Sequence, residues 1–143
     1  MIRLINYLFL LIIFFSCNKE NNDTKFKISH LSTEPTQITE FQENINVRIS
    51  YEHPEGFLGF YDPDYLSLEI KDSRLSNSDF YHLEPINPPN EIVSIVGEIL
   101  IEVDAPFIFG NGNSETLSYS IRIQDQSGNW SNSINSSSIT VSR

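Results

Sequence analysis

Hydrophobic and polar residues alternate along much of the chain after residue 25. The clearest example is INVRISY, residues 45–51, in which every second residue is apolar and the residues between are polar. A period of two is typical of β-strands that bury one face and expose the other. The same pattern recurs at residues 26–29, 66–72, 98–104, 117–125 and 138–141.

These segments predict an all-β fold. No long segment keeps a helical period, and Pro, Gly, Asn and Asp gather between the alternating runs, as strand connections require. About seven short strands predict an antiparallel two-sheet sandwich, formed by residues 26–143 as one domain. The residues expected to point into its core are Phe26, Ile28, Ile45, Val47, Ile49, Tyr51, Leu66, Leu68, Ile70, Ile99, Ile101, Val103, Leu117, Tyr119, Ile121, Ile123, Ile139 and Val141.

The last part of the chain indicates which type of β-sandwich to expect. Residues 119–141 contain a strand, a D-x-x-G-N-x-S turn and a final strand. Gly128 can adopt the positive φ that the turn needs, and Asp125 and Asn129 can accept backbone hydrogen bonds there. This hairpin resembles the end of bacterial immunoglobulin-like surface domains. The order of VRISYEHPEGFLG, LEIKDSR, GEILIEV and DQSGNWSN is similar to uncharacterised immunoglobulin-like lipoproteins, which implies that fold and no particular reaction.

Residues 1–16 do not alternate and are mostly apolar. Arg3 precedes LINYLFLLIIFF, residues 4–15, which is apolar except at Asn6 and Tyr7. As a helix this run would span ~18 Å, against a hydrocarbon core of ~30 Å. It is therefore too short for a transmembrane helix and fits the apolar region of a secretion signal. We expect residues 1–16 to be a signal peptide.

The signal ends at the only cysteine of the chain. FFSC, residues 14–17, resembles the lipobox of bacterial lipoproteins, with Ser16 as the small residue. This resemblance implies lipidation of Cys17, followed by a flexible tether over residues 17–25. Lys19 and Glu20 resemble an export tag of surface lipoproteins. We therefore expect a protein anchored by lipid in the bacterial outer membrane, at the cell surface, with the periplasmic face as the alternative.

Charge and composition exclude several classes of function. The formal net charge is −10, which disfavours nucleic acid as a partner. A single cysteine cannot form an internal disulfide. The three histidines, His30, His53 and His82, do not have the spacing of zinc ligands, and no serine lies in a nucleophile motif. We therefore predict a protein that is not an enzyme and needs no cofactor, calcium excepted.

Calcium is a hypothesis based on loop placement. In an immunoglobulin-like sandwich the loops after the second strand and before the last strand share one end. Carboxylate and amide oxygens are the ligands that calcium prefers. The candidate ligands are Glu52, Glu55, Asp62, Asp64, Asp125 and Asn129; the alternative is that they form ordinary solvated turns.

Aromatic residues supply a second hypothesis. Exposed rings can stack on sugars or contact a protein partner, although a small sandwich also needs large side chains in its core. The candidates are Phe57, Phe60, Tyr61, Tyr65 and Trp130. A sugar-binding protein should gather Trp130 and two of these rings on one exposed face. A protein-binding module should instead show a larger apolar patch or a bare strand edge.

From the sequence we thus expect a lipid-anchored binding or structural module of the cell envelope. Its ligand would be an unidentified protein or glycan. The alternative is a carbohydrate-binding accessory lipoprotein of an outer-membrane uptake system.

Overall fold

The computed structural model describes residues 26–86 and 91–143, and within these ranges it contains strands and no helix. The predicted all-β fold is therefore confirmed. The strands are β1 (Lys27–Glu34), β2 (Gln37–Thr39), β3 (Ile45–His53), β4 (Leu68–Asp72), β5 (Asp79–Tyr81), β6 (Ile95–Val103), β7 (Ser114–Leu117), β8 (Tyr119–Ile123), β9 (Ile134–Asn135) and β10 (Ile139–Ser142).

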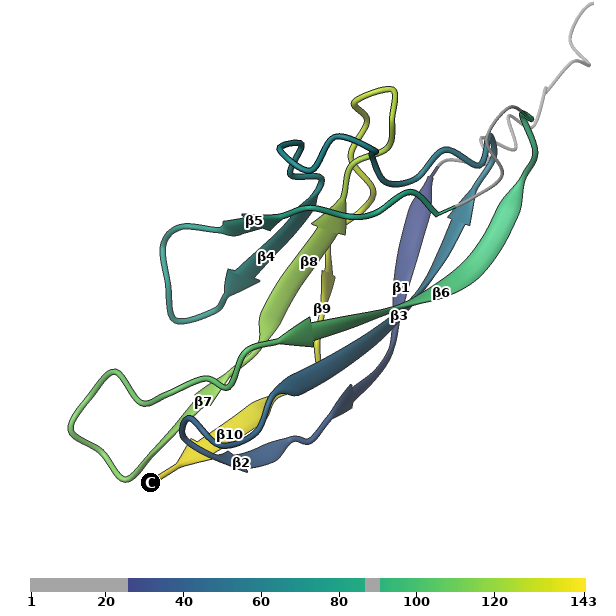
Figure 1. Ribbon diagram of the computed structural model, residues 1–143. Coiled ribbons are helices and arrows are strands. Elements are labelled where there is room, and N and C mark those ends of the chain that lie inside the picture. Colours follow the sequence, from purple (N-terminus) through teal and green to yellow (C-terminus); the bar gives the residue numbers. More distant parts are fainter. Residues whose placement is uncertain (1–25, 87–90) are drawn as a thin grey trace, which may run out of the picture.

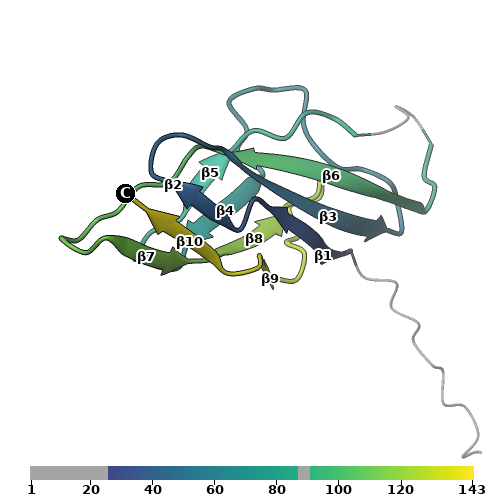
Figure 2. The same cartoon turned by 90° about the horizontal axis from the view of Figure 1, so that it is seen from below.

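The strands form three small sheets, in the orders β1-β3-β6, β2-β10-β7 and β5-β4-β8-β9 (Figure 1). All pairings are antiparallel except that of β2 with β10, which is parallel. β7 and β8 follow one another along one path, so the second and third sheets merge into one layer. Figure 2 shows β3 and β6 on one side and β7, β8 and β9 on the other. The arrangement is consistent with a β-sandwich.

The core lies between these layers and follows the predicted alternation. On β3 the side chains of Ile45, Val47 and Ile49 are completely buried, and the residues between them face outward. Residues from the opposite layer are equally buried and face them across the core. The fully buried residues of that layer are Ile121, Ile123, Ile139 and Val141.

Two details of the prediction were wrong. Leu66 is 47% exposed, because β4 starts only at Leu68 and Leu66 still belongs to the preceding loop. The segment predicted as one strand from 117 to 125 is divided at Ser118. There the chain changes partners, because Leu117 pairs with Ile139 of β10 whereas Tyr119 pairs with Asp72 of β4.

A close contact fixes the pairing of β3 with β6. Tyr51 pairs with Gly97, and a Cβ atom added at Gly97 would lie 2.5 Å from the Tyr51 hydroxyl oxygen. The ring therefore occupies the space that the glycine leaves open. Burial raises the pKa of Tyr51 above its ordinary value.

The sandwich has two ends with different loops. At the N-terminal end, Phe26 begins the described chain, β3 ends and β6 starts (Figure 1). At the C-terminal end lie the last residue, Arg143, the turn after β2 and the loop between β6 and β7. The Arg143 amide donates a hydrogen bond to the Asn113 carbonyl of that loop, at 3.2 Å.

Candidate functional site

Three phenylalanines are exposed together at the C-terminal end. The exposed fractions are 68% for Phe41, 41% for Phe107 and 48% for Phe109. The rings of Phe41 and Phe107 stack with centroids 5.1 Å apart and an interplanar angle of 10°. Phe109 meets Phe107 edge-on at 5.0 Å. We call these three residues the aromatic tip.

The backbone conformation of Phe41 lowers the stability of the folded protein. Its φ is 62°, in the left-handed region that costs a residue with a side chain about 1–2 kcal/mol. Backbone hydrogen bonds hold the turn: the Phe41 amide donates to the Pro106 carbonyl at 3.3 Å, and the Glu40 amide donates to the Ser142 carbonyl at 2.8 Å. The strained backbone thus places a large apolar ring in solvent.

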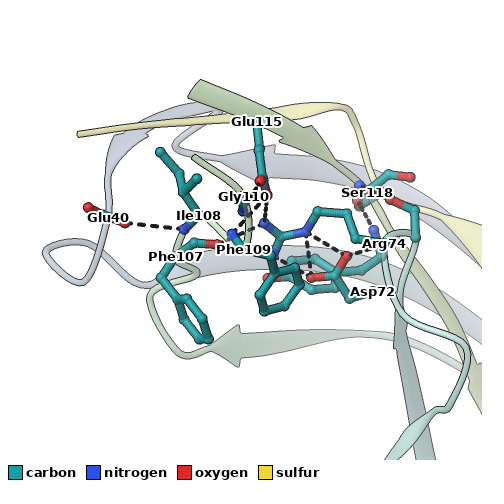
Figure 3. A network of polar contacts seen from close by, with 12 residues as sticks. Glu40, Asp72, Arg74, Phe107, Ile108, Phe109, Gly110, Glu115 and Ser118 are labelled. Carbon is teal, nitrogen blue, oxygen red and sulfur yellow. Dashed lines mark hydrogen bonds and ion pairs between the residues drawn. The ribbon is translucent and has the colours of Figure 1, made fainter. Parts of the chain in front are cut away.

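Arg74, in the turn after β4, supports the tip from inside (Figure 3). Its guanidinium donates to both carboxylate oxygens of Asp72, with the shortest contact at 2.7 Å. It also donates to Glu115 at 2.9 Å and to the Phe107 carbonyl at 2.8 Å. The guanidinium carbon lies 4.3 Å from the centroid of the Phe109 ring, a cation–π contact. Arg74 thus joins both the backbone and a ring of the tip to β4 and β7.

The carboxylates of Glu40 and Glu115 bind the backbone beside the rings of Phe107 and Phe109. Glu115 accepts hydrogen bonds from the amides of Gly110 at 2.7 Å and Phe109 at 3.2 Å, and Glu40 accepts one from Ile108 at 3.2 Å. The Gly110 and Phe109 amides, followed by Arg74, hold the pKa of Glu115 below its ordinary value. Burial opposes the charge of Arg74, but Asp72 and Glu115 outweigh this effect and raise its pKa. The tip is therefore held in one conformation before any partner arrives.

Replacing Arg74 should remove this support. In Arg74→Met, we expect the free energy of unfolding to fall by about 3 kcal/mol, because two carboxylates with side chains mostly buried lose their cation. Urea denaturation measures the change. The control is Arg48→Met, which breaks an exposed ion pair with Glu98 and should cost about 0.5 kcal/mol or less. Equal losses in the two variants would contradict the role given to Arg74.

The aromatic tip is not among the sites predicted from the sequence. One signal was present: in APFIFGNGN, Ile108 separates Phe107 from Phe109, so burying Ile108 turns both phenylalanines the other way. Ile108 is indeed 7% exposed. Phe41 had no comparable signal, because its ring partner lies far away in the sequence.

At the N-terminal end, the structure brings together the two loops of the calcium hypothesis. The Gln126 side chain donates to the Gly59 carbonyl at 2.8 Å, and its backbone amide donates to the Phe57 carbonyl at 3.2 Å. The Tyr65 hydroxyl donates to the Gln124 side chain at 3.0 Å. The loop after β3 and the loop after β8 therefore pack as one unit.

A buried histidine–aspartate pair lies beneath these loops. His53 is 3% exposed and Asp125 is 5% exposed. Nδ1 of His53 accepts hydrogen bonds from the amides of Glu55 at 3.1 Å and Gly56 at 2.9 Å. The ring hydrogen is therefore on Nε2, which donates to Asp125 at 3.3 Å. Both ring nitrogens are engaged, so His53 is not placed to act as a general base.

Asp125 is held as a carboxylate. Burial alone would raise its pKa, but hydrogen bonds from Asn129, His53 and Ser127 outweigh burial and lower the pKa below its ordinary value. The Asn129 backbone donates at 2.8 Å and its side chain at 3.1 Å. Gly128 has a φ of 84°, as predicted for this turn.

This pKa shift predicts a pH dependence of stability. Because the pKa of Asp125 is lower in the folded state, its contribution is complete above its ordinary value of about 3.9 and is lost as the pH falls through the folded value. The loss of stability on acidification should therefore be smaller in Asp125→Asn than in the native chain. Urea denaturation between neutral pH and about pH 2 measures it. The exposed Asp64→Asn serves as the control, and parallel curves for the native chain and Asp125→Asn would contradict the assignment.

The six candidate calcium ligands are not gathered into one site. Asp125 and Asn129 bond to each other, Glu52 forms an ion pair with Lys27 at 2.8 Å, and Asp62 accepts a hydrogen bond from the Asp64 amide at 3.0 Å. Glu55 is exposed. Among residues 26–86 and 91–143, no group of three or more His, Cys, Asp or Glu side chains is placed to hold a metal ion. We therefore do not propose calcium.

A cavity of about 670 Å³ opens beside the buried pair, with Phe26, Pro54 and Trp130 among its lining residues. The polar groups of His53 and Asp125 that border it are bonded to one another and to the loops. Neither member of the buried pair is therefore free to act as a catalytic group in this cavity.

The predicted aromatic candidates are divided between two places. Phe60 and Tyr65 stack with centroids 3.8 Å apart, Tyr61 is 75% exposed and Phe57 is half-buried. The described ring contacts of Trp130 are with Phe80 of β5, at 6.5 Å, and with the Arg122 guanidinium, at 4.5 Å. Trp130 thus packs on the outer face of the β5-β4-β8-β9 sheet and not on the rings of residues 57–65.

The predicted signal peptide, the predicted lipidation site Cys17 and the predicted tether lie outside the described residues. Within the described ranges, the structure contains no helix long and apolar enough to cross a membrane. No protein-family model, curated protein or solved structure matches this chain.

Proposed function

We propose that this chain is a lipid-anchored, immunoglobulin-like module of the bacterial outer membrane that binds a partner protein and catalyses no reaction. The observation that carries the proposal is the aromatic tip, where Phe41, Phe107 and Phe109 are exposed in a fixed arrangement. Contiguous exposed aromatic residues are typical of protein interaction sites.

The strand order supports the immunoglobulin-like type. The order β1-β3-β6 corresponds to the first, second and fifth strands of that sandwich, and the order β4-β8-β9 corresponds to its third, sixth and last strands. β5 is an additional short strand beside β4. Tyr119 stands near the start of β8, where such domains place a buried tyrosine. Its burial, followed by the charge of Asp72, raises the pKa of Tyr119 to about 12.

The positions of the two ends support a tethered module. The described chain begins at Phe26, at the N-terminal end, and the aromatic tip lies at the opposite end (Figure 1). An anchor at Cys17 would therefore hold the N-terminal end near the membrane and direct the tip away from it. The C-terminal end would then face partners in the surrounding medium.

A protein partner is favoured over a glycan. The phenylalanine rings of the tip carry no polar group to orient a sugar, whereas aromatic anchors with little side-chain freedom are typical of protein interfaces. The alternative, a carbohydrate-binding accessory lipoprotein, calls for Trp130 and the rings of residues 57–65 on one face. Trp130 contacts Phe80 and Arg122 instead.

Lipidation can be tested on cells supplied with a clickable fatty acid. We expect the native chain to carry the label and Cys17→Ala to lose it, because no other cysteine is present to accept a lipid. Gel fluorescence after the click reaction measures the label. Ser29→Ala is the control and should keep it. A native chain without label would contradict the anchor.

The aromatic tip can be tested by photocrosslinking on intact cells. A benzophenone amino acid at Phe107 should give an adduct of defined mass with a partner protein, and the added change Phe41→Ser should abolish the adduct. The same amino acid at Tyr61, an exposed aromatic at the other end, should give none. Equal adducts at both positions, no adduct at Phe107, or an adduct unaffected by Phe41→Ser would contradict the proposal.

A further inference from the structure

β6 forms a long edge of the sandwich. It is the last strand in the order β1-β3-β6, and all nine of its residues pair with β3, from Val103 opposite Ile45 to Ile95 opposite His53. In the described part of the chain β3 is its only strand partner. The backbone groups on its other side are therefore available to a further strand.

β6 lacks several of the features that usually protect an edge strand. Edges are commonly short, bulged, or interrupted by Pro or by charged side chains, Lys above all. The charged residues of β6 are Glu98 and Glu102. β1, at the other edge of the same sheet, has a register shift between His30 and Ser32, and β5 has three residues. β6 is longer than β5, contains no Pro or Lys, and keeps a continuous register with β3. It is the least protected long edge among the described strands.

A groove runs beside the second half of β6. It has a volume of about 390 Å³ and lies between β6 and the β4–β5 hairpin of the opposite layer. Its lining includes core residues that are less than a tenth exposed, together with the larger side chains of Tyr81 and Leu83. These core residues are Leu68, Ile70, Ile99 and Ile101. A strand added to β6 would direct every second side chain toward this apolar lining.

The surroundings of the groove are acidic. Residues 75–121 contain no Lys or Arg, and their acidic residues are Asp79, Glu84, Glu91, Glu98, Glu102, Asp104 and Glu115. Glu102 and Asp104 line the groove. Burial, and then the charges of Asp79 and Asp104, raise the pKa of Tyr81, as expected in a negative environment. On the outer face of β6, Glu98 and Glu102 are exposed. Glu98 forms an exposed ion pair with Arg48 of β3 at 3.2 Å, and Glu102 accepts a hydrogen bond from the Asn44 side chain at 2.7 Å, so Arg48 is the basic residue nearest to this acidic face in the described contacts.

We propose that β6 accepts an extended segment of a partner protein in which apolar residues alternate with Lys or Arg. The segment pairs with β6 as an additional strand. Its apolar side chains enter the groove, and its basic side chains lie beside Glu98 and Glu102 on the outer face, as opposite charges do across neighbouring strands. This site lies along an edge and not at the aromatic tip, and it does not depend on the anchor.

Charge argues against a second copy of this chain as the occupant. Pairing of two β6 edges would bring Glu98 and Glu102 of one copy beside the same residues of the other. Like charges on neighbouring strands are destabilising, and each chain also carries a formal net charge of −10. A partner with the opposite charge is therefore the occupant that the edge favours.

The test uses the full-length protein in a neutral detergent and a fluorescent peptide as long as β6, in which Lys alternates with Val and Ile. We expect binding in fluorescence anisotropy, together with slower hydrogen exchange at residues 99–103. Glu98→Lys combined with Glu102→Lys should weaken binding about tenfold or more, because attraction becomes repulsion. The control, Glu43→Lys with Glu55→Lys, makes the same change in net charge at exposed positions elsewhere and should bind like the native chain.

Peptide controls keep the test independent of how the variants fold. A peptide of the same composition with its Lys residues in one block, and the alternating peptide N-methylated on alternate residues of its pairing edge, should both bind far more weakly. No binding of the alternating peptide would overturn the proposal. It would also be overturned by equal losses in the two charge variants, by exchange that is unchanged in β6, or by dimers formed through β6.

Discussion

The packing of branched aliphatic side chains between the two layers is the constraint on which the rest of the structure depends. Ile45, Val47 and Ile49 on β3 are fully buried, as are Ile121 and the other inward residues of the opposite layer. With one cysteine, no internal disulfide adds to this packing. The interior therefore provides the frame, and the loops at each end need polar contacts of their own to be fixed on it.

The two ends use similar chemistry with different results. At the N-terminal end, the buried pair of His53 and Asp125 directs its hydrogen bonds inward and ties two loops to each other. At the C-terminal end, Arg74 binds Asp72 and Glu115, and this network holds phenylalanine rings in solvent. The first arrangement engages both ring nitrogens of His53 and the oxygens of Asp125, whereas the second leaves an apolar surface exposed. This contrast is the reason why we propose that a partner binds at the C-terminal end.

The sequence predicted best where one face of a strand is strictly buried. On β3 the alternation identified Ile45, Val47, Ile49 and Tyr51 as inward residues, because a shift of one position would expose the whole apolar set. His53, which is buried at the end of the strand, was not among them. β2, β5 and β9 have three, three and two residues, too few to show a period, and were not predicted. The predicted start of the strand at Leu66 was wrong because the alternating pattern extends into the loop before β4. The residues of this loop next to β4 do not pair with a neighbouring strand.

The sites were harder to predict, because they depend on residues that meet only in the fold. The acidic residues near Asp125 suggested a cation site, yet Asn129 and His53 already engage its oxygens. Phe41 stacks on Phe107 because the turn after β2 gives Phe41 a positive φ, and no pattern in the sequence predicts that conformation. Arg74 resembled any other surface charge until the structure placed it against Phe109.

The orientation of the molecule on the membrane decides whether the aromatic tip can meet a partner, and it can be measured by energy transfer. With Cys17 lipidated, a cysteine introduced by Asn111→Cys at the C-terminal end, or by Ser29→Cys near the N-terminal end, would be the only free thiol. Energy transfer from a dye at each position to an acceptor in the lipid of isolated envelopes compares their distances from the membrane. We expect weak energy transfer from position 111 and strong energy transfer from position 29. Equal transfer from both, or stronger transfer from position 111, would contradict a module that displays its aromatic tip away from the membrane.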